Sequence, residues 1–303
     1  MGVASSFFRF IWENKLVALS FFIIGAVLSS ALFLDFLAPF DPYLIEMSLR
    51  NLPPGTPAES GGVYLLGTDP LGRDILSRIM LGSQVSMSVG IASVVISGTL
   101  GTFLGLLAGY YRGWIDTMIM RLVDIQMSVP SLLIALLVLY ILGPSFLNVV
   151  LVLAITRWMV YARVARGLVL SLRETLFVEA ARSLGASDAR IIMKHLMPNI
   201  SAPLLVLATL ELAVMLLTEA SLSFLGLGIQ PPDSSWGLML AEGRTYLTSA
   251  WWLVAVPGFA ILLTTLSVNI IATWLRQKTL DERGKKTLEK SDTGVKKQAG
   301  GGQ

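Results

Sequence analysis

Cysteine is absent from the 303 residues of this chain, and histidine occurs only once, at position 195. Disulfide bonds and thiolate metal sites are therefore excluded, and a single imidazole does not make a histidine-based metal site or a catalytic triad. Charged residues are also scarce, at 14%, against 54% hydrophobic residues and a mean hydropathy of +0.71. A soluble domain of this length needs more charge to cover its surface, so the composition predicts an integral membrane protein.

The few charges are unevenly distributed. Residues 276–303 contain eight Lys/Arg and four Asp/Glu, a net charge of +4, whereas the formal charge of the whole chain is +3. The basic pI of about 9.2 therefore comes from a polar tail beside a membrane, and nucleic-acid binding is not indicated. Because this tail has few apolar residues, we expect it to be a disordered cytoplasmic segment.

Hydropathy predicts an all-α protein with six membrane-spanning helices within residues 16–275. The uncharged run 125–156 is too long for one span, and Gly143-Pro144-Ser145 divides it into two. The first apolar segment is too long for a signal peptide and is read as retained. The other predicted spans cover about residues 16–37, 85–110, 204–227 and 251–275.

Basic residues set the orientation of these spans. With residues 1–15 in the cytoplasm, the inside segments hold 17 Lys/Arg and the outside segments hold four. The asymmetry predicts that both termini are cytoplasmic. It also predicts an extracytoplasmic loop at 38–84 and a cytoplasmic loop at 166–200.

The extracytoplasmic loop ends in a predicted short helix. Thr68 or Asp69 can cap it with Pro70 at its first position, and Asp74 and Arg78 have the spacing of an i,i+4 ion pair. Its apolar stripe predicts a helix that lies on the membrane or on neighbouring spans.

The cytoplasmic loop contains two short amphipathic helices on either side of Gly185. This glycine fits the C′ position of the first helix, where a positive φ is needed. Ser187 can cap the second helix, Asp188 is favoured in its first turn, and Pro198 is expected to end it. On periodicity alone, an interfacial linker is the alternative interpretation of this segment.

Three segments resemble one family in the right order. EAARSLGASDARIIMKHLMPN (residues 179–199) resembles the EAA loop of bacterial ABC importer permeases, although that pattern has aliphatic residues in place of His195 and Leu in place of Met197. GTDPLGRDILSR (67–78) and SFLGLGIQPPDSSWG (223–237) resemble motifs of the dipeptide/oligopeptide/nickel branch. The first loop and the chain length resemble its C-type permease, and the resemblance covers about residues 10–278.

The resemblance implies a type I ABC importer permease fold in the bacterial or archaeal cytoplasmic (inner) membrane. The EAA loop would be a coupling element that docks on an ATPase, with Glu179 facing a basic group there. No GxxxxGK[ST] sequence is present, so ATP and Mg²⁺ are expected on partner subunits, with no cofactor in this chain. The expected docking residues are Glu179, Ala180, Ala181, Arg182, Gly185, Ala186, Ser187, Asp188, His195 and Pro198.

The implied partners are a homologous permease in a heterodimer, two ATP-binding-cassette ATPases and an extracytoplasmic substrate-binding protein. The chain is then a transport subunit and not an enzyme. Short peptides are the implied substrates, with nickel chelates or glutathione-like compounds as minority options. Two other classes of function stay open: a self-contained secondary transporter or channel, and a membrane anchor or receptor.

Polar residues inside the predicted spans are candidates for a translocation pathway, because each is costly unless it faces protein or water. Glu211, Met215 and Glu219 fall on one stripe of span five. Hydrogen bonding between helices is an equally good explanation of the two glutamates, and Arg157 is a possible partner. The candidate pathway residues are Glu211, Met215, Thr218, Glu219, Ser221 and Asn269.

Overall fold

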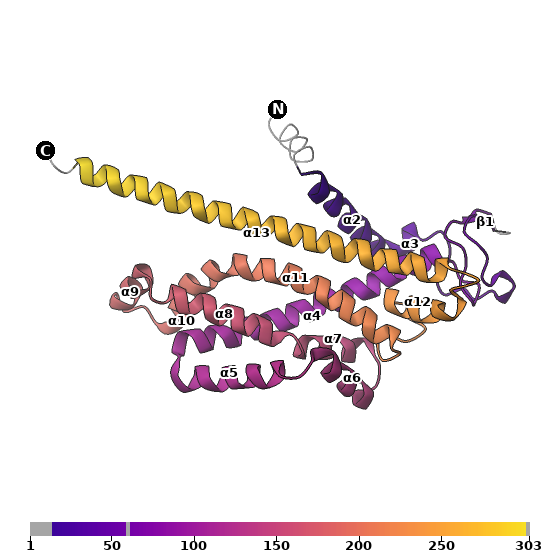
Figure 1. Cartoon of the computed structure of the whole chain (residues 1–303), viewed down its shortest axis with the longest axis horizontal. Coiled ribbons are helices and arrows are strands. Elements are labelled where there is room, and N and C mark those ends of the chain that lie inside the picture. The colour runs from indigo at the N-terminus through magenta and orange to yellow at the C-terminus, as the bar shows by residue number, and fades with distance from the viewer. Residues whose placement is uncertain (1–13, 59–60, 301–303) are drawn as a thin grey trace.

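In the computed structural model, which describes residues 14–58 and 61–300, nearly every element is a helix (Figure 1). The long helices run side by side, with α9 and α10 at one end of the bundle and α12 and the strands at the other. The first of these ends is the one that the basic residues place in the cytoplasm, and it is called the cytoplasmic end below. The elements are α2 (Lys15–Leu32), α3 (Leu34–Leu37), η1 (Met47–Leu49), the antiparallel pair β1 (Thr56–Pro57) and β2 (Val63–Tyr64), α4 (Ile75–Tyr111), α5 (Gly113–Met127), α6 (Ser131–Leu142), α7 (Phe146–Ile155), α8 (Trp158–Leu172), α9 (Leu176–Ser183), α10 (Asp188–Ile191), η2 (Ile192–Leu196), α11 (Met197–Phe224), α12 (Trp236–Gly243), η3 (Arg244–Tyr246) and α13 (Trp252–Gly300).

The helices account for the predicted membrane spans. Within the described residues, five helical runs are long and apolar enough to cross a membrane, and α5 with α6 makes a sixth span that is bent by 85°. Two boundaries differ from the prediction. The third span begins at Gly113, before the uncharged run, and the fourth continues to Leu172, well beyond it.

The tail also differs from the prediction. The backbone of α13 continues as helix to Gly300, where composition predicts disorder, and side chains are described as far as residue 279. Because the apolar part of α13 has already nucleated the helix, each further residue adds a hydrogen bond without a new nucleation cost.

A row of small residues brings α4 against α8. Ser97, Gly101, Gly105 and Gly109 recur every four residues on α4, and each glycine faces the backbone or a small side chain of α8. A Cβ atom on Gly105 would lie 2.4 Å from the carbonyl oxygen of Ala162. Close backbone approach through small residues is how membrane helices associate without a hydrophobic driving force between them.

Replacing Gly105 with alanine is therefore expected to destabilise the chain by about 1–3 kcal/mol, because α4 and α8 must separate to admit the methyl group. Gly167→Ala is the matched control, since a Cβ atom there meets nothing within 4 Å. Thermal unfolding of the two variants in detergent measures the difference. Equal midpoints would show that this contact does not limit stability.

A buried ion network closes the extracytoplasmic end. The Asp69 carboxylate accepts hydrogen bonds from Arg73 Nε at 2.6 Å and Arg78 Nη1 at 2.7 Å. Arg78 also donates to Glu242 of α12 at 2.7 Å and to Ser234 at 3.2 Å. The network joins the first loop to the segment after α11, which are far apart in the sequence.

The helix predicted to begin at Pro70 is wrong in its start and in its ion pair. The helix begins at Ile75, with Asp74 as the capping residue that accepts from the Ser77 amide at 2.8 Å. Residues 68–74 instead form a turn around Asp69, and Arg78 pairs with Asp69 instead of Asp74. The Asp74 carboxylate also accepts from the Ser77 hydroxyl at 2.7 Å, which stabilises the cap. Burial acts in the opposite direction and raises the pKa of Asp74.

Candidate functional site

Gly185 makes the turn between α9 and α10, as the sequence predicts. Its φ is +79°, and the Ala186 and Gly185 amides donate to the carbonyls of Ala181 and Arg182, both at 3.0 Å. These two bonds form a Schellman motif, which satisfies the last carbonyls of α9. Ser187 occupies the N-cap position of α10, although its side chain makes no capping hydrogen bond.

The protruding helices expose apolar side chains at the cytoplasmic end of the bundle. Leu176 is 83% exposed and Leu184 is 88% exposed, and Phe177 and Met193 are exposed beside them. An exposed apolar surface on a segment at the end of a helix bundle is typical of a site for another protein. The expected docking residues surround it: Glu179, Ala180, Arg182, Gly185, Ser187, Asp188 and Pro198 are exposed, and Ala181, Ala186 and His195 are half-buried.

The opposite side of the protrusion is fixed to the bundle. Val178, Ile191 and Leu196 are fully buried in a core that also contains residues of α4, α8 and α11. The apolar face of α9 is thus divided: one residue anchors the helix, and the larger leucines point away. A protrusion anchored in this way moves as one body with three membrane helices, because packed cores resist local deformation.

Tyr110, at the end of α4, reinforces this attachment and was not anticipated from the sequence. Its hydroxyl donates to the Asp188 carboxylate at 2.6 Å. The guanidinium groups of Arg173 and Arg182 lie 5.9 Å and 5.8 Å from the centre of its ring. No local sequence signal links Tyr110 to Asp188, because 78 residues separate them.

Replacing Tyr110 with phenylalanine is expected to loosen α10 while leaving the core intact. The variant loses a charge-assisted hydrogen bond worth about 1 kcal/mol, since Tyr110 is buried but its partner Asp188 is exposed to solvent. Faster amide hydrogen exchange in residues 176–192 measures the effect. Tyr111→Phe is the control, because the side chain of this neighbouring tyrosine is exposed, and equal exchange in the two variants would contradict the prediction.

His195 and Pro198 have structural explanations. The His195 ring packs near Phe177 of α9, with 6.4 Å between ring centroids, so it connects α9 to the turn η2. Pro198 does not end the second helix as expected, because α10 runs through the π-helical turn η2 into α11. Pro198 lies in the first turn of α11, directly after the wider π-helical turn η2. At this position the proline nitrogen, which has no hydrogen to donate, does not need a backbone partner.

The stripe of Glu211, Met215 and Glu219 faces the interior of this chain. Arg157 binds Glu211 through two hydrogen bonds of 2.7 Å, which makes a bidentate pair between α8 and α11. Glu219 is 1% exposed and accepts from Ser223 at 2.7 Å and from Ser86 of α4 at 3.2 Å. The geometry supports contacts between helices for these residues rather than a pathway.

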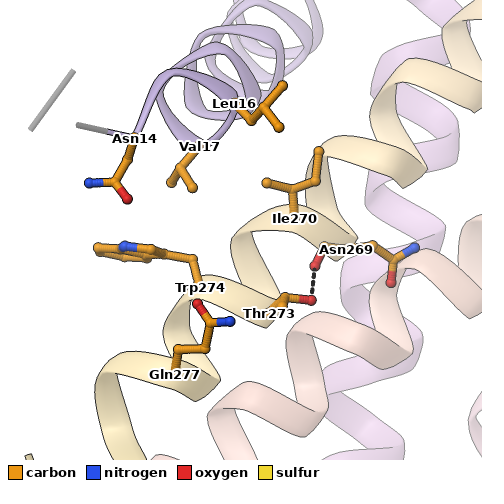
Figure 2. A pocket seen from close by; sticks show the side chains of 8 residues that line it. All are labelled: Asn14, Leu16, Val17, Asn269, Ile270, Thr273, Trp274 and Gln277. Carbon is orange, nitrogen blue, oxygen red and sulfur yellow. Dashed lines mark hydrogen bonds between the residues drawn. The ribbon is translucent and has the colours of Figure 1, made fainter. Parts of the chain in front are cut away.

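The other pathway candidates lie on different surfaces. Thr218 and Ser221 are on the outer side of α11, half-buried and exposed, and each hydroxyl donates to a backbone carbonyl one turn earlier. Asn269 is exposed on α13, at a groove between α13 and the start of α2 (Figure 2). Val17 and Trp274 border the same groove.

Several known proteins are similar in sequence to this chain over most of its length. The model of the family described as binding-protein-dependent transport system inner membrane component matches residues 101–281. The di/tripeptide transport system permease protein DppC of Pseudomonas aeruginosa is 43% identical over 246 residues, which are 81% of each chain. The probable D,D-dipeptide transport system permease protein DdpC of Escherichia coli is 40% identical over 88% of this chain and 89% of its own length.

A third relative differs in its named substrate. The glutathione transport system permease protein GsiD of Pectobacterium atrosepticum is 38% identical, over 88% of this chain and 87% of its own length. The family match includes α8, the protrusion and α11, which are the elements joined around Tyr110. Because the match extends over more than half of the sequence, this chain belongs to the family of inner membrane components of binding-protein-dependent transport systems.

Proposed function

We propose that this chain is the permease subunit of an ABC importer for short peptides and forms half of the translocation pathway. It would pair with a homologous permease as a heterodimer, receive substrate from an extracytoplasmic binding protein, and rest on two ATPases that hold ATP and Mg²⁺. The residues listed above around Gly185 would contact the ATPase. The chain would then transmit the closure of the ATPases and perform no hydrolysis itself.

The observation that supports this proposal most directly is the two-sided protrusion at the cytoplasmic end. Leu176 and Leu184 present an apolar surface to a partner, while Val178 and Ile191 bind the protrusion to α4, α8 and α11. A partner that pulls on this surface moves three membrane helices together, which is a rigid-body switch. The named substrates of the relatives, di- and tripeptides, D,D-dipeptides and glutathione, all contain amide-linked amino acids.

Reconstitution tests the function. Proteoliposomes that contain the four-subunit complex, supplied with binding protein outside and ATP inside, are expected to accumulate a labelled dipeptide. Omission of ATP or of the ATPases is expected to abolish uptake. Uptake by this chain alone along an ion gradient would instead establish the secondary transporter and overturn the proposal.

A second measurement tests the docking surface. Leu184→Asp places a charge where an apolar contact with the ATPase is expected, so the ATPases should no longer co-purify with the permease pair. Leu184→Met is the matched control, because it keeps an apolar side chain of similar size. Full recovery of ATPases with the aspartate variant would move the docking site away from α9.

A further inference from the structure

The span made by α5 and α6 is broken in a way that lipid does not tolerate. It bends by 85° at residues 128–130, and Met127, Ser128, Val129 and Pro130 are all exposed. Within the described residues, the carbonyls of Met127, Ser128 and Val129 accept no backbone hydrogen bond. We call residues 127–130 the elbow.

The elbow lies part-way along a candidate membrane span. Gln126, just before it, donates to the Ile155 carbonyl at the break between α7 and α8, and accepts from the Trp158 indole at 2.8 Å. The Trp158 carbonyl in turn faces Gly101 of α4. Gly101 is ten residues from the end of α4, so the elbow is roughly 15 Å from the cytoplasmic end of that helix and level with the span predicted at 85–110.

A half-exposed ion pair accompanies the elbow. Arg163 of α8 and Asp124 of α5 are joined at 2.7 Å, and their side chains are 50% and 59% exposed. This pair differs from the Arg157–Glu211 pair nearby, which is largely covered by its own chain. Ala162, next to Arg163, faces Gly105, so the pair lies about one helical turn closer to the cytoplasmic end than the elbow. Charges within a membrane span face either protein or a water-filled cavity, because lipid cannot solvate them.

We infer that the elbow and the Asp124–Arg163 pair form part of the wetted wall of the translocation pathway, an inference that rests on the proposed function. Irregular backbone at membrane depth is tolerated only where protein buries it or water reaches it. Burial of the pair against a second subunit would cost several kcal/mol per ion unless new hydrogen bonds formed. A water-filled path leaves the pair and the free carbonyls hydrated.

The chemistry of this wall suits a zwitterionic peptide. The carboxylate of Asp124 and the carbonyls at the C-terminal end of α5 attract an ammonium group, since a helix C-terminus carries partial negative charge. The guanidinium of Arg163 is a donor for a carboxylate. An extended di- or tripeptide could thus replace water at both charges as it passes, and both charges recover their mutual contact when it leaves.

Because the chain has no cysteine, single cysteines report directly on water at each position. The test uses Ser128→Cys in the assembled importer in proteoliposomes, with a charged, membrane-impermeant methanethiosulfonate and labelling measured on this subunit. Phe22→Cys on α2 is the control exposed to lipid, since Phe22 is 73% exposed on an apolar helix. Ala135→Cys on α6 is the buried control.

We expect Ser128→Cys to react at least about tenfold faster than either control, because thiolate forms only in contact with water. We also expect its rate to change when vanadate traps the ATPases with ATP, and to fall when a saturating dipeptide is present. Labelling no faster than Phe22→Cys would place the elbow in lipid or in a subunit interface and overturn the inference.

A second variant separates the pair from the elbow. Asp124→Asn is expected to slow dipeptide uptake by about tenfold, whereas Asp124→Glu is expected to retain most of it, because only the charge is required. Equal uptake by both variants would remove the pair from the wall. Dipeptide uptake by the unmodified complex is measured in the same vesicles, so a wrong substrate class shows as absent uptake with Ser128→Cys still reactive.

Discussion

Replacing Arg78 with alanine is expected to lower the free energy of unfolding by about 3 kcal/mol, because it removes one of the two cations that neutralise the Asp69 and Glu242 carboxylates. Arg78 is 2% exposed and binds Asp69, Glu242 and the Ser234 hydroxyl, so its loss leaves Arg73 as the remaining cation beside both carboxylates. The first loop would then separate from α12. A lower midpoint of thermal unfolding in detergent, with less assembled complex in the membrane, measures this effect.

Two further variants give the Arg78 prediction its controls. Arg112→Ala removes an ion pair whose side chains are 43% and 66% exposed, and exposed pairs contribute only about 0–1 kcal/mol. Arg78→Lys keeps the charge but loses the planar fork that reaches Asp69, Glu242 and Ser234 together, so its midpoint is expected to lie between the other two. If Arg78→Ala and Arg112→Ala had the same effect, the ion network would not be what holds the first loop against α12.

The span boundaries show where sequence reasoning stops. The charges on α5 and α8 led to the expectation that these segments were loops, because hydropathy counts each charge as a cost. In the structure Asp116 pairs with Arg166 at 2.5 Å and Asp124 pairs with Arg163 at 2.7 Å, across the two helices. Partners about 40–50 residues apart neutralise one another, and no local window contains that information.

The cytoplasmic loop was predictable because its signals are local. Positive φ at Gly185 and the position of Ser187 before α10 depend on neighbouring residues only, and both are found, although the Ser187 side chain makes no capping hydrogen bond. The direction of each apolar face was not predictable, since it depends on whether α4 and α8 or a partner lies opposite. The same limit applies to Glu211 and Glu219: the sequence places them on one stripe, but only the packing of α4 and α8 shows that the stripe faces inward.

The row of glycines on α4 is a sequence signal for a close contact between helices. Ser97, Gly101, Gly105 and Gly109 have a four-residue period, which predicts a close helix contact in a membrane. The partner of that contact, α8, could not be named from the period alone. A pattern of small residues therefore identifies one side of an interface, and the opposite side comes from the structure.

Replacing Gly185 with valine is expected to uncouple ATP hydrolysis from transport. Its φ of +79° lies where a β-branched residue is strongly disfavoured, and a Cβ atom there meets nothing within 4 Å, so the effect is backbone strain and not a clash. Relief of that strain opens the Schellman turn and rotates α9 relative to α10. We expect dipeptide uptake per ATP hydrolysed to fall by about tenfold or more, because hydrolysis then proceeds without moving the membrane helices.

Asparagine at position 185 separates this cause from others, because it adds a side chain but tolerates the left-handed conformation. Gly185→Asn should retain most of the coupling, and Gly185→Ala should lie between asparagine and valine. Membrane insertion and the unfolding midpoint should change little in all three, since the turn is exposed and the anchors Val178, Ile191 and Leu196 stay buried. Equal coupling in the valine and asparagine variants would mean that the geometry of this turn is not what transmits movement from the ATPases to α4, α8 and α11.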